Sequence, residues 1–296
     1  MEEKLTTNKL NIHPFFDENT QTVTYVVTDN ATCLTAVIDP VLDFDPASGK
    51  LSSTSADKVI AYLDENNLRL QWILETHAHA DHITAANYLK AKRGGQIGIG
   101  EHIKKVQSTF KTTFNFSDDL PCDGSQFDFL FEDREIITLG HLNFHVMHTP
   151  GHTPACVSYL IEDVAFVGDT IFMPDFGTAR ADFPNGSAKT LYHSIQKILS
   201  LPDLTRIFVG HDYKSPTRND YAWETTVWQE KRNNIHVKLG TTEAEFVSLR
   251  ESRDENLPVP RLLLPSIQLN IRAGHLPIEE VNGVAYLKLP LTVELN

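Results

Sequence analysis

The sequence has little cysteine. Its 296 residues include only Cys33, Cys122 and Cys156, an odd number with no CxxC pair. This excludes a disulfide-rich scaffold and favours a reducing compartment, so we expect a cytoplasmic protein. Long apolar runs are also missing: no stretch approaches the ~18 residues of a membrane-spanning helix, and the first residues lack the apolar core of a signal peptide. We therefore expect no membrane partner.

Positive charge is scarce as well. Lysine and arginine number 26 against 39 aspartates and glutamates, which gives a formal charge of −13. Such a chain does not suit a polyanion, so nucleic acid is excluded as a partner. The hydrophobic share of 41% and charged share of 22% are those of a globular protein. A chain of this length buries about three quarters of its surface on folding, so it needs no disulfide or metal to fold.

Two β-rich halves, each followed by helical patterns, predict a layered α/β architecture in which two sheets pack together and helices cover the outside. The polar loops would then gather at the strand tips along one edge. The expected strands lie at 22–28, 32–39, 70–74, 96–100 and 206–210, with more between 135 and 168, and the expected helices lie at 84–92, 101–110, 187–199 and in a segment capped by Ser55.

The character of the sequence changes after Pro216. Residues 221–237 predict a long helical stretch, and Thr242 to Glu245 form a capping box that opens another helix. The last 40 residues carry five prolines and predict an irregular arm. We therefore divide the chain into a main domain, 1–215, and a C-terminal extension, 216–296, packed on it.

The segment THAHADH, residues 76–82, is the strongest chemical signal. It places His77, His79, Asp81 and His82 directly after a predicted buried strand. Imidazole and carboxylate are well suited to first-row divalent metals. His77 and His79 lie on the same side of the strand end, and Asp81 and His82 can turn back toward them, so the segment predicts a metal site.

Three further residues match this motif in kind: His152 in TPGH, Asp169 in GD and His211 in GH. Each follows a predicted strand or tight turn, where glycine lets the backbone approach closely. A single histidine or a single Gly-Asp pair would not predict a metal site, because such residues are usually solvated or in turns. Cys156 lies close to His152, but its apolar strand predicts a small buried packing residue instead of a nucleophile.

In this order, HxHxDH, TPGH, GD and GH resemble the metallo-β-lactamase superfamily over residues 10 to 215. The resemblance implies an αββα sandwich with its metal site on one edge of the two sheets, followed here by a helical and irregular extension. In the two-metal form of that family, the first metal would take His77, His79, His152 and Asp169, and the second Asp81, His82, His211 and the bridging Asp169.

Flanking residues are similar to one branch, the bacterial persulfide dioxygenases, also called sulfur dioxygenases. The similar segments are HADHIT, the loop 175–183, GHDY at 210–213 and the tail 264–274. This resemblance implies one Fe(II) per chain held by His77, His152 and Asp169, and oxidation of glutathione persulfide with O2 to sulfite and glutathione. The remaining site residues, His79, Asp81, His82 and His211, would then form a polar shell around the ligands.

The same resemblance implies two substrate contacts and a homodimer. Arg180 suits a glutathione carboxylate, because guanidinium binds carboxylate bidentately and stays charged. Tyr213 can donate a hydrogen bond near the metal. The alternative for Arg180 is a loop salt bridge with Asp175 or Asp182. One departure is the segment TARADFP, where the animal enzymes carry a shorter GRTDFQ-like segment and only RxDF matches.

The ligand motifs alone leave a second enzyme class open. A zinc-dependent glutathione thioester hydrolase, similar to glyoxalase II, or another hydrolase of this fold would use the same donors with one or two Zn²⁺. In that case His79, Asp81, His82 and His211 would bind metal directly. A metal-buffering or sensing protein is disfavoured, because nothing resembles a DNA-reading element.

Overall fold

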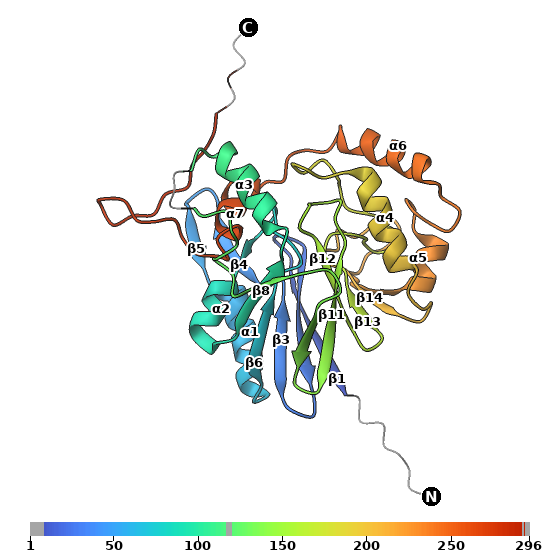
Figure 1. Ribbon diagram of the computed structural model, residues 1–296, viewed down its shortest axis with the longest axis horizontal. Helices are drawn as coiled ribbons and strands as arrows, with labels where there is room; N and C mark the ends of the chain where they lie inside the picture. The colour runs from blue at the N-terminus through green and yellow to red at the C-terminus, as the bar shows by residue number, and fades with distance from the viewer. Residues whose placement is uncertain (1–8, 117–119, 292, 294–296) are drawn as a thin grey trace, which may run out of the picture.

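Two six-stranded sheets form the centre of the computed structural model, which describes residues 9–116, 120–291 and 293 (Figure 1). The first sheet has the order β1 (Leu10–Asp17), β2 (Thr22–Asp29), β3 (Leu34–Ile38), β6 (Arg69–Leu74), β8 (Gln96–Gly100) and β9 (Phe129–Phe131). The second has the order β10 (Ile136–Leu139), β11 (Leu142–His148), β12 (Val157–Ile161), β13 (Val164–Phe166), β14 (Arg206–Phe208) and β15 (Glu224–Thr226). A small third sheet joins β5 (Lys50–Ser52), β4 (Val41–Asp45) and β7 (Ile83–Thr84).

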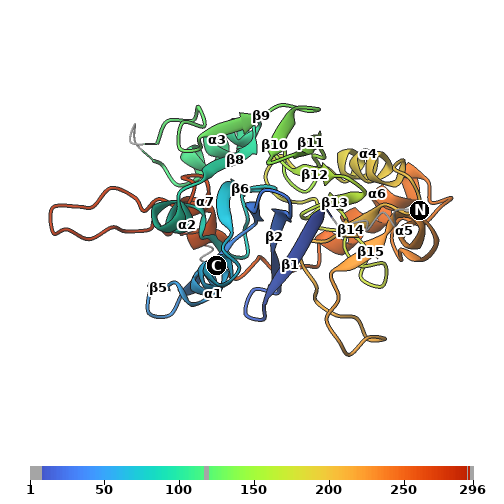
Figure 2. The same ribbon diagram turned by 90° about the horizontal axis from the view of Figure 1, so that it is seen from below.

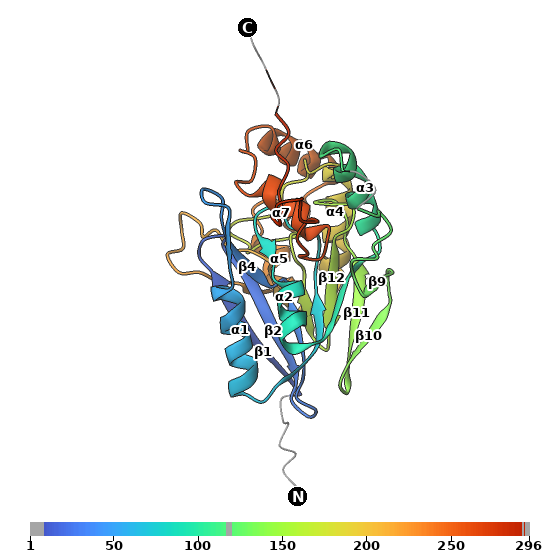
Figure 3. The same cartoon turned by 90° about the vertical axis from the view of Figure 1, so that its left-hand side faces the viewer.

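Helices cover both outer faces. The first sheet carries α1 (Thr54–Glu65), α2 (Ala86–Arg93), α3 (Ile103–Thr113) and α7 (Leu263–Asn270), several of which face the viewer in Figure 3. The second carries α4 (Ala188–Leu199), α5 (Val227–Asn233) and α6 (Glu243–Asp254). Figure 2, seen from below, shows the two sheets as adjacent layers. The predicted αββα arrangement is therefore confirmed.

Side-chain alternation along the strands explains the layers. In β2, Val23, Tyr25 and Val27 point into the apolar cluster between the sheets, whereas Val26 joins the cluster under the helices of the first sheet. A strand buried on both faces reads as a continuous β-branched and aromatic run, which is how TVTYVVT appears in the sequence. No helix among the described residues is long and apolar enough to cross a membrane.

Two expectations for the extension were wrong. Residues 221–237 do not form one long helix, because Glu224–Thr226 pairs with β14 as an edge strand and leaves a seven-residue helix, α5. Two consecutive threonines favour the strand, and the hydroxyl of Thr226 then accepts from the Gln229 N–H as the N-cap of α5. The capping box at Thr242 is confirmed at the start of α6.

The final 40 residues are not irregular throughout. They contain α7, whose Ile267 and Leu269 are buried in the cluster on the first sheet or beside it. Pro265 lies in the first turn of this helix, where a missing N–H costs nothing. Residues 275–291 run as an irregular arm, as expected (Figure 1). Strand β1, which contains Pro14, was not predicted.

Helix α7 ends at a buried side chain that holds the loop after β6. The Asn270 amide donates to the carbonyls of His79 and His82, both at 2.8 Å, and its oxygen accepts from the Thr84 N–H at 2.9 Å. The extension therefore supplies the hydrogen-bond partners of a loop about 190 residues earlier in the chain.

Replacing Asn270 with alanine should lower the free energy of unfolding by about 2–4 kcal/mol, because two buried carbonyls and one buried N–H lose their partner together. Urea denaturation measures the change. The matched control is Asn256→Ala, since the exposed Asn256 amide donates only to the Ser252 carbonyl; its effect should stay below about 0.5 kcal/mol. Equal stabilities for the two variants would contradict this role of α7.

Candidate metal centre

Four chain segments meet at one edge of the two sheets. The loop with His77, His79, Asp81 and His82 follows β6, and His152, Asp169 and His211 follow β11, β13 and β14. The strand tips are joined by hydrogen bonds from the Val23 N–H to the Gly210 carbonyl and from the Gly210 N–H to the Gly168 carbonyl. Gly168 has φ of +49°, and a Cβ there would lie 2.5 Å from the Thr76 hydroxyl oxygen, so a larger residue would push this edge apart.

His77, His152 and Asp169 form the first group. Oδ2 of Asp169 lies 3.9 Å from Nε2 of His77 and 3.8 Å from Nε2 of His152. All three side chains are buried, with at most 7% of any residue exposed. Nε2 of His77 and Oδ1 of Asp169 have no hydrogen-bond partner among the described residues. Two imidazole nitrogens and one carboxylate therefore face a common point.

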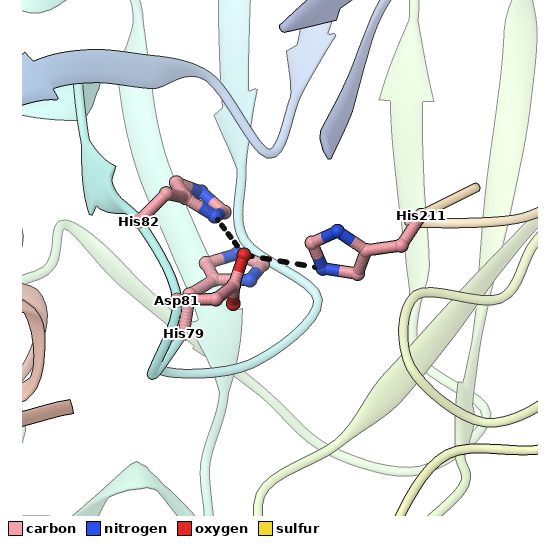
Figure 4. A group of neighbouring side chains, drawn as sticks. All are labelled: His79, Asp81, His82 and His211. Carbon is pink, nitrogen blue, oxygen red and sulfur yellow. Dashed lines mark hydrogen bonds and ion pairs between the residues drawn. The ribbon is translucent and has the colours of Figure 1, made fainter. Parts of the chain in front are cut away.

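The second group contains His79, Asp81, His82 and His211, whose ligand atoms lie within 4.8 Å of one another. Figure 4 shows the Asp81 carboxylate between two rings: Oδ2 is 3.2 Å from Nδ1 of His82 and 3.5 Å from Nε2 of His211. Nε2 of His211 is also 3.3 Å from Oδ1 of Asp169. This contact joins the two groups into one centre.

The donor set fits a divalent metal. One nitrogen in each of His77, His79 and His82 is buried and has no hydrogen-bond partner in the described part of the chain, which is costly for a polar group unless a ligand binds it. Imidazole and carboxylate are the ligands that iron and zinc accept in proteins. His77, His152 and Asp169 could hold one ion, and the second group offers further donors beside it.

Outer hydrogen bonds fix the rings. Nδ1 of His152 lies 2.8 Å from the Arg180 carbonyl, which only accepts, so the proton is on Nδ1 and Nε2 is free to coordinate. Nε2 of His79 lies 3.1 Å from Oδ1 of Asp39 and 3.1 Å from Oε2 of Glu75, which leaves its buried Nδ1 as the free nitrogen. Each ring is thus oriented by an acceptor on its far side.

The electrostatics follow from these contacts. Burial alone would lower the pKa of His79, but the Asp39 and Glu75 carboxylates raise it well above its usual value. Burial, together with the neighbouring His79 and His152, holds the pKa of His77 well below its usual value. Burial also raises the pKa of Glu75 despite the nearby His79. These directions favour a charged His79 beside a neutral His77.

Arg180 and Tyr213 both line the cavity in front of the first group. The Arg180 guanidinium forms a bidentate ion pair with Asp182, at 2.5 and 2.6 Å, and donates to the Pro258 carbonyl. The loop salt bridge considered from the sequence is therefore present. The Tyr213 ring stacks on His211, with ring centroids 5.5 Å apart. Burial raises the pKa of Tyr213 well above its usual value, with Asp81 and Asp169 adding to the effect.

The cavity measures about 460 Å³ and reaches the first group through His152 and Asp169. Its far walls come from the loop 172–180 and from the C-terminal extension. The extension contributes positive charge and apolar surface: Arg250, Arg253, Leu257, Pro258, Pro260, Arg261 and Leu262. A small molecule with an anionic group fits this lining.

Sequence reasoning missed several residues of this region. Asp39 and Glu75 belong to no metal-binding motif. Their contacts with His79 form only in the folded chain, where the strand ends meet. Asn270 and Arg250 lie far from the site in sequence. His236 has no motif around it in the sequence, and in the structure it lines the cavity. Cys156 is confirmed as a packing residue, since it is buried and burial raises the pKa of its thiol to about 12.

Comparison with known proteins agrees with this geometry. A family model described as the metallo-beta-lactamase superfamily matches residues 18–211. Glyoxylase B2 of Dictyostelium discoideum is 50% identical over 286 residues, covering 96% of this chain and 98% of that protein. A beta-lactamase hydrolase-like protein of Xylella fastidiosa is 51% identical over 277 residues; this chain spans 64% of the length of that relative.

A further similarity concerns oxygenases. Persulfide dioxygenase ETHE1 of Homo sapiens, described as mitochondrial, is 30% identical over 266 residues, covering 89% of this chain and 88% of that protein. The crystal structure of ETHE1 from Myxococcus xanthus matches with a TM-score of 0.72 and 30% identity, covering 90% of this chain and 100% of that chain. These matches confirm the predicted fold class.

One buried carboxyl, that of Glu230, forms no ion pair with any described residue. Glu230 is fully buried, and its Oε2 accepts from the Asn234 amide at 2.7 Å, while Oε1 has no partner among the described residues. Burial raises the pKa of Glu230 to about 8. In the unfolded chain a glutamate titrates near ~4.3.

Stability should therefore fall as pH rises from about 5 to 8, because the unfolded state releases this proton while the folded state keeps it. Glu230→Gln should remove this pH dependence of the stability, because glutamine does not titrate. The free energy of unfolding should rise by about 1–3 kcal/mol at pH 8 and change little at pH 5. Urea denaturation at both pH values tests it, with the exposed Glu251→Gln as control. A gain of the same size at pH 5 and pH 8 would show that Glu230 is ionised in the folded protein.

Proposed function

Because the chain belongs to the metallo-β-lactamase superfamily, we propose that it is an Fe(II)-dependent persulfide dioxygenase that oxidises glutathione persulfide with O2 to sulfite and glutathione. The observation that carries the proposal is that Nε2 of His77, Nε2 of His152 and the Asp169 carboxylate face one common point. Two histidines and one carboxylate are the facial donor set of non-haem iron oxygenases. The similarity to the two ETHE1 proteins supports it.

Bound Fe(II) would supply a redox-active centre whose open positions accept O2 and the substrate sulfur, which redox-inert Zn²⁺ does not offer. The chain supplies the surroundings. His211 lies between Asp81 and Asp169, with its Nε2 3.5 Å from Oδ2 of Asp81 and 3.3 Å from Oδ1 of Asp169. Burial alone would lower the pKa of His211, but these carboxylates raise it, so a charged ring would be an ion-pair partner for Asp169. In this proposal the second group orients Asp169 and binds no metal.

The cavity lining suits the rest of the substrate. Tyr213 keeps its phenolic proton at neutral pH and can donate it in a hydrogen bond. Arg180 presents its guanidinium to the cavity while Asp182 holds it, so a substrate carboxylate would share that charge. Phe172, Phe176 and Leu262 give the cavity in front of the metal group an apolar lining. The homodimer and the cytoplasmic location remain predictions.

A second candidate function is a zinc-dependent glutathione thioester hydrolase. The observation that favours it is the second group, whose four donors lie close enough to hold an ion of their own. The relatives with hydrolase and glyoxylase names, about 50% identical, agree with this alternative. A second ion beside the first would activate water and polarise a thioester carbonyl.

Metal content and reaction separate the two functions. Protein purified without added metal should contain about one iron per chain by elemental analysis, and it should consume O2 when glutathione persulfide is added. Removing the iron with a chelator should abolish uptake, and ferrous salt alone should restore it. Two zinc ions per chain with thioester hydrolysis and no O2 uptake would establish the hydrolase instead.

Two histidine variants give an independent test. His152→Ala should abolish metal binding, because it removes a ligand of the first group. His211→Ala should keep about one iron per chain, because in the dioxygenase this ring orients Asp169 without binding metal. The exposed His141→Ala serves as the control for loss of a histidine. Loss of one of two metal ions in His211→Ala would favour the hydrolase.

A further inference from the structure

His236 is a buried ring with an unused donor. It is 5% exposed, and its Nδ1 accepts from the Thr178 N–H at 3.0 Å. A backbone N–H only donates, so the proton of the neutral ring is on Nε2. Nε2 has no hydrogen-bond partner among the described residues, although the side chain lines the cavity. A buried N–H without a partner is costly, so this position is suited to a ligand acceptor.

The ring is held rigidly in place. Asn234 accepts from the His236 N–H at 2.9 Å and donates to the Gly177 carbonyl at 3.0 Å. Gly177 packs against the ring so closely that a Cβ there would lie 2.2 Å from Nδ1 of His236. Burial, together with Arg250 and Arg253, lowers the pKa of His236 to about 4, so the ring stays neutral and Nε2 keeps its proton at physiological pH.

The same wall carries arginines, and not all of them form an ion pair with a described carboxylate. The Arg250 guanidinium donates to the Asp254 carboxylate and to the Thr178 carbonyl. The side chains of Arg253 and Arg261 are exposed and form no ion pair or hydrogen bond with another described residue. Arg253 is close enough to act on His236, whereas Arg261 acts on Asp45. Arg253 is therefore a cation that acts on His236 and has no ion-pair partner in the described part of the chain.

We propose that His236 and Arg253 form a carboxylate-binding subsite that holds a carboxylate of the glutathione part of the substrate. A carboxylate accepts from a neutral N–H with one oxygen and pairs with a guanidinium through the other. The identity of this ligand rests on the proposed function. The subsite belongs to the loop after α5 and to α6, so it lies outside the four segments that build the metal centre.

Binding of glutathione and of glutathione diethyl ester, in which both carboxylates are blocked, tests the subsite. Isothermal titration on the metal-loaded protein should show about tenfold tighter binding of glutathione than of the ester, the size of one hydrogen bond to a charged group. Arg253→Ala should weaken glutathione binding about tenfold and leave ester binding unchanged, and Arg253→Lys should restore part of the loss.

His236→Ala should also weaken glutathione binding. Arg232→Ala is the control, because Arg232 is exposed, stacks on Trp228 and does not line the cavity. Since Arg253 is exposed, its variant tests the proposal without risk to folding. Equal affinity of Arg253→Ala and the unmodified protein for glutathione would overturn the subsite. An equal loss for glutathione and its ester would overturn it as well.

Oxygen uptake separates this proposal from the function it rests on. If the protein consumes O2 with glutathione persulfide, and Arg253→Ala raises KM about tenfold with kcat unchanged, the dioxygenase and the subsite are both supported. Uptake with an unchanged KM would overturn the subsite and leave the dioxygenase standing. Selective glutathione binding without uptake would overturn the dioxygenase and leave the subsite standing.

Discussion

The buried carboxylate of Asp39 is the contact on which the rest of the site depends. It lies just after β3 and accepts from the N–H and hydroxyl of Thr76, at 2.7 and 2.8 Å, and it lies 3.1 Å from Nε2 of His79. Burial would raise its pKa, but His79 lowers it, so Asp39 remains an acceptor. Because this side chain fixes both the start of the loop and the His79 ring, the free nitrogens after β6 face the tips of the second sheet.

The C-terminal extension completes the site from the other side. Asp254 accepts from the Ala181 N–H at 2.8 Å, and Arg250 donates to the Thr178 carbonyl at 3.0 Å, so α6 holds the loop between these residues. That loop supplies the carbonyl of Arg180, which orients His152. With Asn270 holding the loop after β6, the extension determines the position of both ligand-bearing loops and also walls the cavity. The site is therefore a product of the whole chain and not of the sandwich alone.

The parts predictable from the sequence were local. HAHADH, TPGH, GD and GH each follow a strand, and strand ends meet at one edge of a layered fold, so the sequence predicted that these side chains lie together, as they do in the structure. The extension was predicted less well, because β15 forms by pairing with β14, and α7 is joined through Asn270 to a loop nearly 200 residues earlier in the chain. Asp39, Glu75 and His236 belong to no sequence motif. Each is buried beside a polar group that only the fold brings near, so only the folded structure identifies it.

The central claim is that a single iron ion is held by His77, His152 and Asp169. A crystal structure of the protein purified without added metal, with anomalous diffraction recorded on both sides of the iron absorption edge, tests it most directly. The account predicts one iron peak per chain between those three side chains and none between Asp81, His82 and His211. Two peaks, or a peak that appears only at the zinc edge, would contradict it.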